Sequence, residues 1–159
     1  MTRIYIIGTV GSGKSTFAHR LSMRYSIPHF ELDDVVYNGN YKRTQKERDQ
    51  LFNEILSKKD WVIEDVGRPC FQSGLQQADT IIYLNISPHI LKKRIIKRYF
   101  KQKFGLEKAN YTPTWAMLKQ MLRWCQQDLD KREMLMKQLQ SHSAEFISLD
   151  EHQLKHFTL

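Results

Sequence analysis

The sequence predicts an α/β protein, a three-layer αβα sandwich built on a five-stranded parallel sheet. Short apolar segments alternate with helical patterns along the chain, which is typical of parallel strands joined by right-handed helical crossovers. Segment 80–86 is apolar at almost every position, as expected for a strand covered on both faces. The length of 159 residues suits one domain over residues 1–159, with enough chain to bury a core.

Five segments have the composition of strands. They are 3–7, 27–32, 60–65, 80–86 and 146–149. The second runs into the acidic pair Asp33-Asp34, and the third runs into the loop Val66-Gly67-Arg68-Pro69. Parallel sheets of this kind bind ligands at the carboxyl ends of their strands. We therefore expect these polar residues to gather at one edge of the sheet.

Helical periodicity fills the segments between the strands. The predicted helices are 15–25, 45–58, a short segment within 71–78, 87–103 and 114–140. Thr44 is the expected N-cap of the second helix, with Glu47 as its capping-box partner. A turn is expected at Asn38-Gly39-Asn40, and Asp150 is a candidate cap for a closing helical turn. In the last long helix we expect these side chains to point inward: Met117, Met121, Trp124, Leu129, Leu135 and Leu139.

The charge favours anionic partners. A net charge of +8 suits nucleotides, nucleic acid or an acidic surface. Much of the excess lies in one basic segment, which contains Lys92, Lys93, Arg94, Lys97, Arg98, Lys101, Lys103 and Lys108. A solvated helix face has the same composition, so the charge alone does not define a site.

Other features bound the setting. Since there is no long apolar run and no signal-peptide pattern, we expect a cytoplasmic protein without a membrane partner. Cys70 and Cys125 are isolated, so free thiols are expected rather than a disulfide or a metal site. No metal-ligand spacing is visible among the histidines, which are His19, His29, His89, His142, His152 and His156.

One motif carries chemistry. Gly8-Thr9-Val10-Gly11-Ser12-Gly13-Lys14-Ser15 fits the phosphate-binding pattern G-x-x-x-x-G-K-[ST], and it lies between a predicted strand and a predicted helix. Glycines allow such a loop to turn its backbone N–H groups onto a phosphate chain. Lys14 is predicted to contact the β- and γ-phosphates, and the Ser15 hydroxyl to bind Mg²⁺. The predicted nucleotide-binding residues are Gly8, Gly11, Ser12, Gly13, Lys14, Ser15 and Thr16.

With these residues in place, the chain resembles the small P-loop kinases, a group that includes adenylate and shikimate kinases. Within that group it is most similar to bacterial proteins labelled DNA topology modulation proteins. The resemblance rests on residues 8–16, on Leu32-Asp33, on Trp61-Val62-Ile63-Glu64 and on basic residues such as Arg94 and Arg98. It implies the strand order 2-3-1-4-5, a mobile lid at about residues 92–113, and the use of ATP and Mg²⁺.

The chain departs from the subgroup after its third strand. The subgroup has an acidic residue followed by Gly-Asn-Tyr, whereas this chain has Glu64-Asp65-Val66-Gly67-Arg68. That spacing is similar to the Asp-Gly-Phe-Pro-Arg segment of adenylate kinases, in which the arginine holds the phosphate of the acceptor. The resemblance therefore makes Arg68 a candidate for binding an anionic acceptor, with a surface arginine as the alternative.

Phosphoryl transfer also needs carboxylates that hold the metal and orient the acceptor. Asp33 is the candidate that accepts a hydroxyl proton or holds Mg²⁺ through water, and Asp34 is its rival at the acceptor site. Glu64 is the candidate metal carboxylate, partly through water, and Asp65 is its rival. Because side chains alternate along a strand, only one of Glu64 and Asp65 can face the site.

Arg94 and Arg98 are the candidate lid cations. They lie four residues apart on one predicted helix, so both can reach one phosphate chain. In the kinase interpretation they close over ATP and stabilise the charge of the transition state. For Arg98 a solvated face is an equal alternative. Arg132 is a further lid or scaffold candidate.

The sequence thus predicts an ATP- and Mg²⁺-dependent kinase that transfers the γ-phosphoryl group to a nucleoside, a nucleotide or another small acceptor. The alternative is a nucleic-acid-associated ATP-binding protein whose basic helices bind phosphate backbones. A third possibility is a nucleotide sensor without catalysis. Either a monomer or a homodimer is compatible with the sequence.

Overall fold

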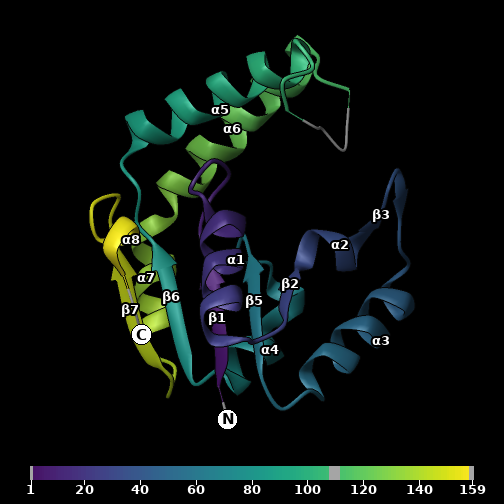
Figure 1. Cartoon of the computed structure of the whole chain (residues 1–159), viewed down its shortest axis with the longest axis vertical. Coiled ribbons are helices and arrows are strands. Elements are labelled where there is room, and N and C mark those ends of the chain that lie inside the picture. Colours follow the sequence, from purple (N-terminus) through teal and green to yellow (C-terminus); the bar gives the residue numbers. More distant parts are fainter. Residues whose placement is uncertain (1, 108–111, 158–159) are drawn as a thin grey trace.

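The computed structural model describes residues 2–107 and 112–157, and it has the predicted three-layer sandwich (Figure 1). Five parallel strands form the central sheet in the spatial order β2-β5-β1-β6-β7. The strands are β1 (Arg3–Ile7), β2 (His29–Glu31), β5 (Trp61–Asp65), β6 (Thr80–Leu84) and β7 (Glu145–Leu149). Counted along the chain, these five strands have the order 2-3-1-4-5, which confirms the expected topology.

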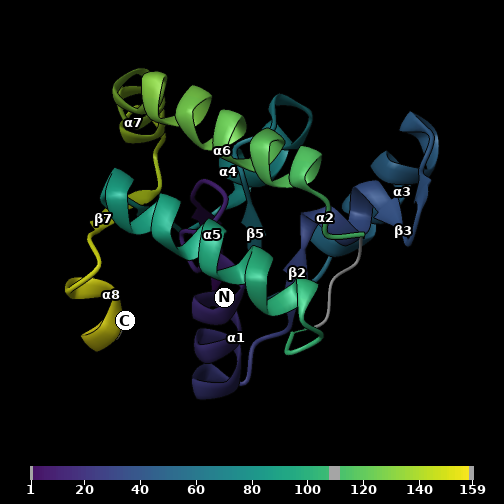
Figure 2. The same cartoon turned by 90° about the horizontal axis from the view of Figure 1, so that it is seen from above.

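Helices cover both faces of the sheet, and two of them lie above the carboxyl ends of its strands (Figures 1 and 2). The helices are α1 (Lys14–Tyr25), α2 (Leu32–Val36), α3 (Gln45–Leu56), a 3-10 turn (Pro69–Phe71), α4 (Gln72–Gln77), α5 (Pro88–Lys103), α6 (Trp115–Asp130), α7 (Arg132–Gln140) and α8 (Gln153–His156). The two above the strand ends are α5 and α6, which pack against each other. The part of the predicted lid from 92 to 103 belongs to α5.

Alternation along the strands divides the core into two apolar clusters. Ile6 and Val62 belong to the cluster that contains residues of α1, α5 and α6. Ile7 and Ile63 belong to the cluster that contains residues of α2, α3, α4 and α7. Every residue of β5 and β6 is buried, and for β6 the continuous apolar pattern of segment 80–86 predicted this.

Local sequence signals explain several boundaries. Thr44 caps α3 through the predicted capping box with Glu47, since Glu47 N donates to Thr44 Oγ1 and Thr44 N donates to the Glu47 carboxylate. Pro88 occupies the first turn of α5, where its missing N–H costs no helical bond. The Asp150 carboxylate accepts hydrogen bonds from the N–H groups of His152 and Gln153 just before α8.

Other boundaries differ from the prediction. The second strand ends at Glu31, and the chain continues into α2 and then into a hairpin of β3 (Tyr37–Asn38) and β4 (Tyr41–Lys42) around the predicted turn. The segment from 114 to 140 is two helices, α6 and α7, which meet at Lys131 with φ −97° and ψ −1°. Part of the lid prediction, residues 108–111 with Lys108, lies outside the described residues.

The prediction of which side chains in segment 114–140 point inward was partly wrong. Trp124 is 46% exposed, whereas Leu118 and Cys125 are buried in its place. The remaining predicted positions are buried or partly buried, namely Met117, Met121, Leu129, Leu135 and Leu139. Both cysteines are free, with Cys70 exposed and Cys125 buried. Among the described helices, none has the combined length and apolarity needed to cross a bilayer.

Gly74 in α4 gives a test of the core. A Cβ atom there would lie 2.8 Å from Cε2 of Tyr5 and 2.9 Å from Cζ of Phe52. We expect Gly74→Ala to lower the free energy of unfolding by about 1 kcal/mol or more, because displacing two buried rings outweighs the better helix propensity of alanine. Urea denaturation measures the change. The exposed neighbour variant Ser73→Ala should stay within about 0.5 kcal/mol of wild type, and equal stability of both variants would contradict the prediction.

Candidate active site

The P-loop, residues 8–15, connects β1 to α1 and forms the floor of the site. Gly11 and Gly13 have φ values of +79° and +94°, in the left-handed region that favours glycine. Within the loop, Ser12 N donates to Thr9 O at 3.1 Å, and Phe17 N donates to Gly13 O at 3.0 Å. The first N–H groups of α1 lack partners within the helix, and such N-termini bind phosphate groups well.

Lys14 and Ser15, the first residues of α1, lie against a buried carboxylate. Ser15 Oγ donates to Glu64 Oε1 at 2.5 Å, and Lys14 Nζ is 4.0 Å from Glu64 Oε2. Glu64 is 4% exposed, and its Oε2 has no hydrogen-bond partner among the described residues. Asp65, the next residue, points to the opposite face of the sheet. Of the two carboxylates that the sequence left open, Glu64 is therefore the one beside the P-loop.

The environment of Glu64 changes its acidity. Burial raises the pKa of Glu64 to about 7, although the Lys14 ammonium and the Ser15 hydroxyl act in the opposite direction. The carboxylates of Glu31 and Asp33 add to the increase. Near neutral pH the Glu64 carboxyl is therefore present in both its protonated and its ionised form. A cation bound beside it would favour the ionised form.

This pKa predicts a pH-dependent stability when divalent metals are removed with a chelator. The folded pKa of about 7 lies above the ordinary value of 4.5, so the folded protein keeps a proton that the unfolded chain loses. The stabilisation is full below about pH 4.5 and is lost as the pH rises through about 7. From pH 5 to pH 8 we expect Glu64 to cost about 2 to 3 kcal/mol of unfolding free energy. Urea titrations at both pH values should show this loss in wild type and not in Glu64→Gln; identical pH dependence would contradict the assignment.

A cavity of about 410 Å³ opens between the P-loop and α5. Its lining residues are Gly11, Gly13, Lys14, Ser15, Thr16, Arg94, Lys97, Arg98, Lys101 and Glu107. Lys97 and Arg98 lie three and four residues after Arg94, and Lys101 lies three residues after Arg98, which places the four α5 cations on one side of the helix. The same cavity thus combines the glycine loop with five positive side chains.

The two predicted lid arginines differ in their contacts. Arg94 Nη1 donates to the carbonyl oxygens of Ser12 at 2.9 Å and Gly11 at 3.4 Å, so its charge is fixed against the loop. Arg98 Nε is 3.2 Å from a Glu107 carboxylate oxygen, and its side chain is half exposed. Arg94 is therefore held in place, whereas Arg98 can leave an exposed ion pair at little cost.

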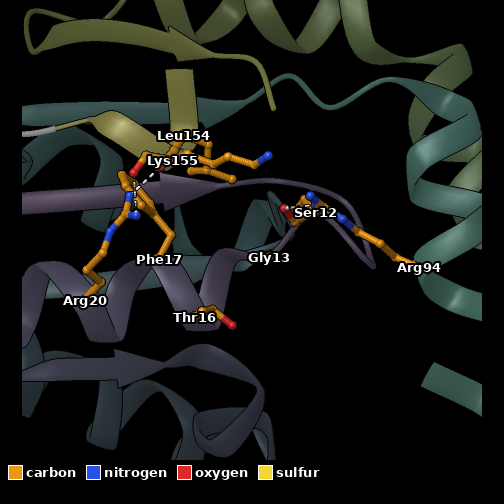
Figure 3. Close-up of a pocket in the computed structure, with 8 residues that line it drawn as sticks. All are labelled: Ser12, Gly13, Thr16, Phe17, Arg20, Arg94, Leu154 and Lys155. Carbon is orange, nitrogen blue, oxygen red and sulfur yellow. Dashed lines mark hydrogen bonds between the residues drawn. The ribbon is translucent and has the colours of Figure 1, made fainter. Parts of the chain in front are cut away.

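A second cavity, of about 390 Å³, continues from the first along α1 (Figure 3). It shares Gly13, Thr16 and Arg94 with the first cavity, and its other lining residues are Ser12, Phe17, Arg20, Leu154 and Lys155. Arg20 donates hydrogen bonds to the carbonyl oxygens of Leu154 and Lys155, which ties α8 to α1. The lining is mainly apolar on the α1 and α8 sides, unlike the cationic first cavity.

The other predicted acidic and basic residues form a network beside the P-loop. Arg68 donates to the carboxylates of both Asp65 and Asp33. Asp65 also accepts the N–H of Gly67 at 2.8 Å, which fixes the turn that carries Arg68. Asp33 is 66% exposed at its side chain, so its pairing with Arg68 faces solvent. Asp34 is exposed as well, and its backbone carbonyl accepts a hydrogen bond from Arg43.

Several contributors to the site were not singled out from the sequence. Lys97 and Lys101 line the first cavity, and their spacing of about one and two helical turns from Arg94 was the available signal. Thr9 in the P-loop donates its hydroxyl to Asp128 of α6, 119 residues away, and nothing in the sequence pattern indicates that contact. Arg132 donates to the Ile86 carbonyl oxygen at 2.7 Å, which fits its scaffold role.

The arrangement fits a nucleoside triphosphate with a divalent cation. The loop glycines and the cations of α5 suit a phosphate chain. The Ser15 hydroxyl and the Glu64 carboxylate suit a hard cation that prefers oxygen ligands. Fold and site together define a nucleotide-binding protein of the P-loop class, with the fold of the small P-loop kinases.

Comparison with known proteins gives the family. Residues 4–109 match the family described as AAA domain, and the chain belongs to that family. It is 25% identical over 122 residues to an adenylate kinase of Rickettsia bellii, over 60% of this chain and 58% of that protein. It is 27% identical over 112 residues to a shikimate kinase of Phocaeicola vulgatus, over 60% of this chain and 63% of that protein. The chain therefore spans less than two thirds of the length of either relative.

Solved structures agree on the fold. A shikimate kinase from Bacteroides thetaiotaomicron superposes with a TM-score of 0.62 at 18% identity, covering 98% of this chain and 93% of that one. A gluconokinase from Sinorhizobium meliloti superposes with a TM-score of 0.56 at 16% identity, covering 98% and 86%. At these identities the likeness concerns the fold.

Proposed function

We propose that the protein is an ATP- and Mg²⁺-dependent phosphotransferase that moves the γ-phosphoryl group of ATP to a nucleoside, a nucleotide or a similar small acceptor. The observation that carries this proposal is the first cavity, in which Lys14 and Ser15 face four cations of α5. Phosphoryl transfer depends on positioning and on neutralising charge spread over phosphate oxygens, and this cavity supplies both. The similarity to adenylate and shikimate kinases supports the same reaction class.

Each residue of the cavity has a separate role in this proposal. The P-loop N–H groups and Lys14 bind the β- and γ-phosphates, while Ser15 and Glu64 hold the metal ion, Glu64 partly through water. Mg²⁺ held there would supply positive charge that offsets the negative charge of the phosphates. Arg94 keeps the loop in shape through its carbonyl contacts and adds a fixed positive charge. Arg98 supplies a movable charge once it leaves Glu107.

The second cavity is proposed to hold the base and ribose of ATP. It continues from the phosphate site through Gly13, Thr16 and Arg94, so one extended ligand can occupy both cavities. The apolar surfaces of Phe17 and Leu154 suit a planar base, which is partly apolar and stacks readily. Figure 3 shows Phe17 and Leu154 among the side chains that line this cavity.

The acceptor is proposed to bind on the Asp33–Arg68 side. Asp33 would orient the acceptor hydroxyl and receive its proton, since its carboxylate is exposed and lies on the P-loop edge of the sheet. Arg68 would bind a negative group of the acceptor in place of Asp33, which frees Asp33 for the hydroxyl. Asp34 is the alternative acceptor ligand.

A nucleic-acid-associated role remains the alternative prediction, as does the DNA topology modulation subgroup, and neither gains support from these findings. The cations of α5 that line the P-loop cavity suit the phosphates of one nucleotide. Nucleic-acid binding would appear as duplex binding that weakens steeply with salt in gel-shift titrations. A cytoplasmic location, a monomeric or homodimeric state and a single domain over residues 1–159 also stay predictions.

The proposal is tested by measuring ADP formation from ATP and Mg²⁺ over a panel of nucleosides, nucleotides and hydroxy acids. At least one acceptor should stimulate ADP formation and appear as a phosphorylated product. Anionic acceptors should depend on Arg68, so Arg68→Gln should raise their KM with less effect on neutral acceptors. ATP consumption that no acceptor stimulates would contradict the proposal.

A further inference from the structure

A histidine and two carboxylates converge on the edge of the sheet, below the phosphate site. His29 and Glu31 are two residues apart on β2, and they pair in register with Val62 and Glu64 of β5. Because neighbouring parallel strands keep their side chains in step, His29, Glu31 and Glu64 point to the same face. Their ligand atoms all lie within 4.8 Å of one another.

One buried atom in each of two of these side chains lacks a hydrogen bond within the described part of the chain, although the Lys14 ammonium lies 4.0 Å from the Glu64 atom. The Nε2 atom of His29 and the Oε2 atom of Glu64 have no hydrogen-bond partner among the described residues, and both atoms are inaccessible to solvent. Glu64 as a whole is 4% exposed. Its Oε1 already accepts the Ser15 hydroxyl, so Oε2 is the oxygen available to a further ligand. Buried polar atoms are normally satisfied, and a bound cation satisfies both at once.

We infer that His29, Glu31 and Glu64 form a binding site for a divalent transition-metal ion of the Zn²⁺ class. One imidazole nitrogen and two carboxylate oxygens are a donor set that Zn²⁺ accepts, whereas Mg²⁺ prefers oxygen ligands throughout. Metal–ligand bonds of about 2.1 Å bring ligand atoms to within about 4 Å of each other. Small side-chain rotations would bring the three ligand atoms from their present separations of up to 4.8 Å to that distance.

The site is coupled to the P-loop through one side chain. Glu64 would hold the ion through Oε2 and keep Ser15 through Oε1. The ion would also neutralise the carboxylate that now lies 4.0 Å from Lys14. Metal occupancy would thereby change the charge beside the phosphate-binding loop. The inference concerns metal binding alone and holds whether or not the protein transfers phosphate.

The experiment is a calorimetric titration of the metal-free full-length chain with ZnCl₂, without nucleotide or acceptor. We expect one Zn²⁺ per chain, no displacement by millimolar Mg²⁺, and visible d–d absorption when Co²⁺ replaces Zn²⁺. His29→Gln should lower the Zn²⁺ affinity at least about 10-fold, since losing a ligand costs no less than losing a neighbour that orients one. Glu31→Gln should lower it as well, and it serves as the second variant if His29→Gln does not fold by circular dichroism.

Two further variants define the controls. His89→Gln changes an exposed histidine on α5 and should leave the affinity unchanged. His19 lies near enough to His29 to lower the pKa of His29. His19 is, however, exposed on α1 and does not belong to the cluster. An equal loss in His19→Gln and His29→Gln would overturn the inference in favour of a surface histidine pair. Absence of Zn²⁺ binding, or binding that both His29→Gln and Glu31→Gln leave intact, would also overturn it.

Discussion

Replacing Lys14 with alanine is expected to lower kcat/KM for phosphoryl transfer by about 10³-fold or more. Lys14 is the P-loop cation at the start of α1, and electrostatic contacts to transferring phosphates supply rate accelerations of that order. Its ammonium is also the only positive side chain among the described residues that forms an ion pair with Glu64. Coupled measurement of ADP formation with the best acceptor gives the change.

Lys46→Ala is the matched control, because Lys46 is an exposed lysine on α3 away from both cavities. It should keep wild-type kinetics and stability. Thermal unfolding of Lys14→Ala checks that its fold is intact. If acceptor-dependent ADP formation persisted in a folded Lys14→Ala protein, the P-loop would not be the site of transfer.

Asp33→Asn is expected to lower kcat by about 10²- to 10⁴-fold while leaving ATP affinity nearly unchanged. The amide keeps the shape of the carboxylate but cannot accept the acceptor proton, and general-base catalysis contributes an effect of that size. Asp33 also reaches Arg68, so its role concerns the acceptor side of the site. Steady-state kinetics measure kcat, and fluorescent ATP-analogue titration measures binding.

Asp34→Asn provides the comparison, since Asp34 is the neighbouring exposed acid on the same short helix. It should retain most of the wild-type rate. A larger loss in Asp34→Asn than in Asp33→Asn would reverse the assignment of the two carboxylates. Equal and small losses would place the general base elsewhere.

Most of the fold can be predicted from the spacing of apolar residues. The helix break at Lys131 and the exposed Trp124 could not. The apolar runs and the capping signals gave the sheet strands and α5 to within a few residues. The break at Lys131 was hidden because no glycine or proline marks it. Trp124 was placed inward because it continues the apolar spacing of Met117 and Met121, whereas packing against α5 selects Leu118 and Cys125.

The sequence predicted the parts of the candidate site whose residues are close together in the chain. It did not reveal the parts whose residues meet only in the folded protein. The P-loop is contiguous in sequence, and alternation along β5 correctly limited the choice to one of Glu64 and Asp65. The contact between Thr9 and Asp128 depends on how α6 packs, which no spacing reveals. His29 showed no ligand spacing, because its carboxylate neighbour Glu64 comes from a strand that is adjacent only in the folded sheet.

The packing of Gly11 limits how segments of this chain could be exchanged with those of its relatives. A Cβ atom at Gly11 would lie 3.1 Å from Ile95 and 3.2 Å from the Leu91 carbonyl oxygen, so the first half of α5 supports the loop directly. A chimaera that exchanges the chain from Pro88 onward would replace the part of α5 that packs against Gly11. A junction placed after Ile95 would keep that part and transfer only the movable charges.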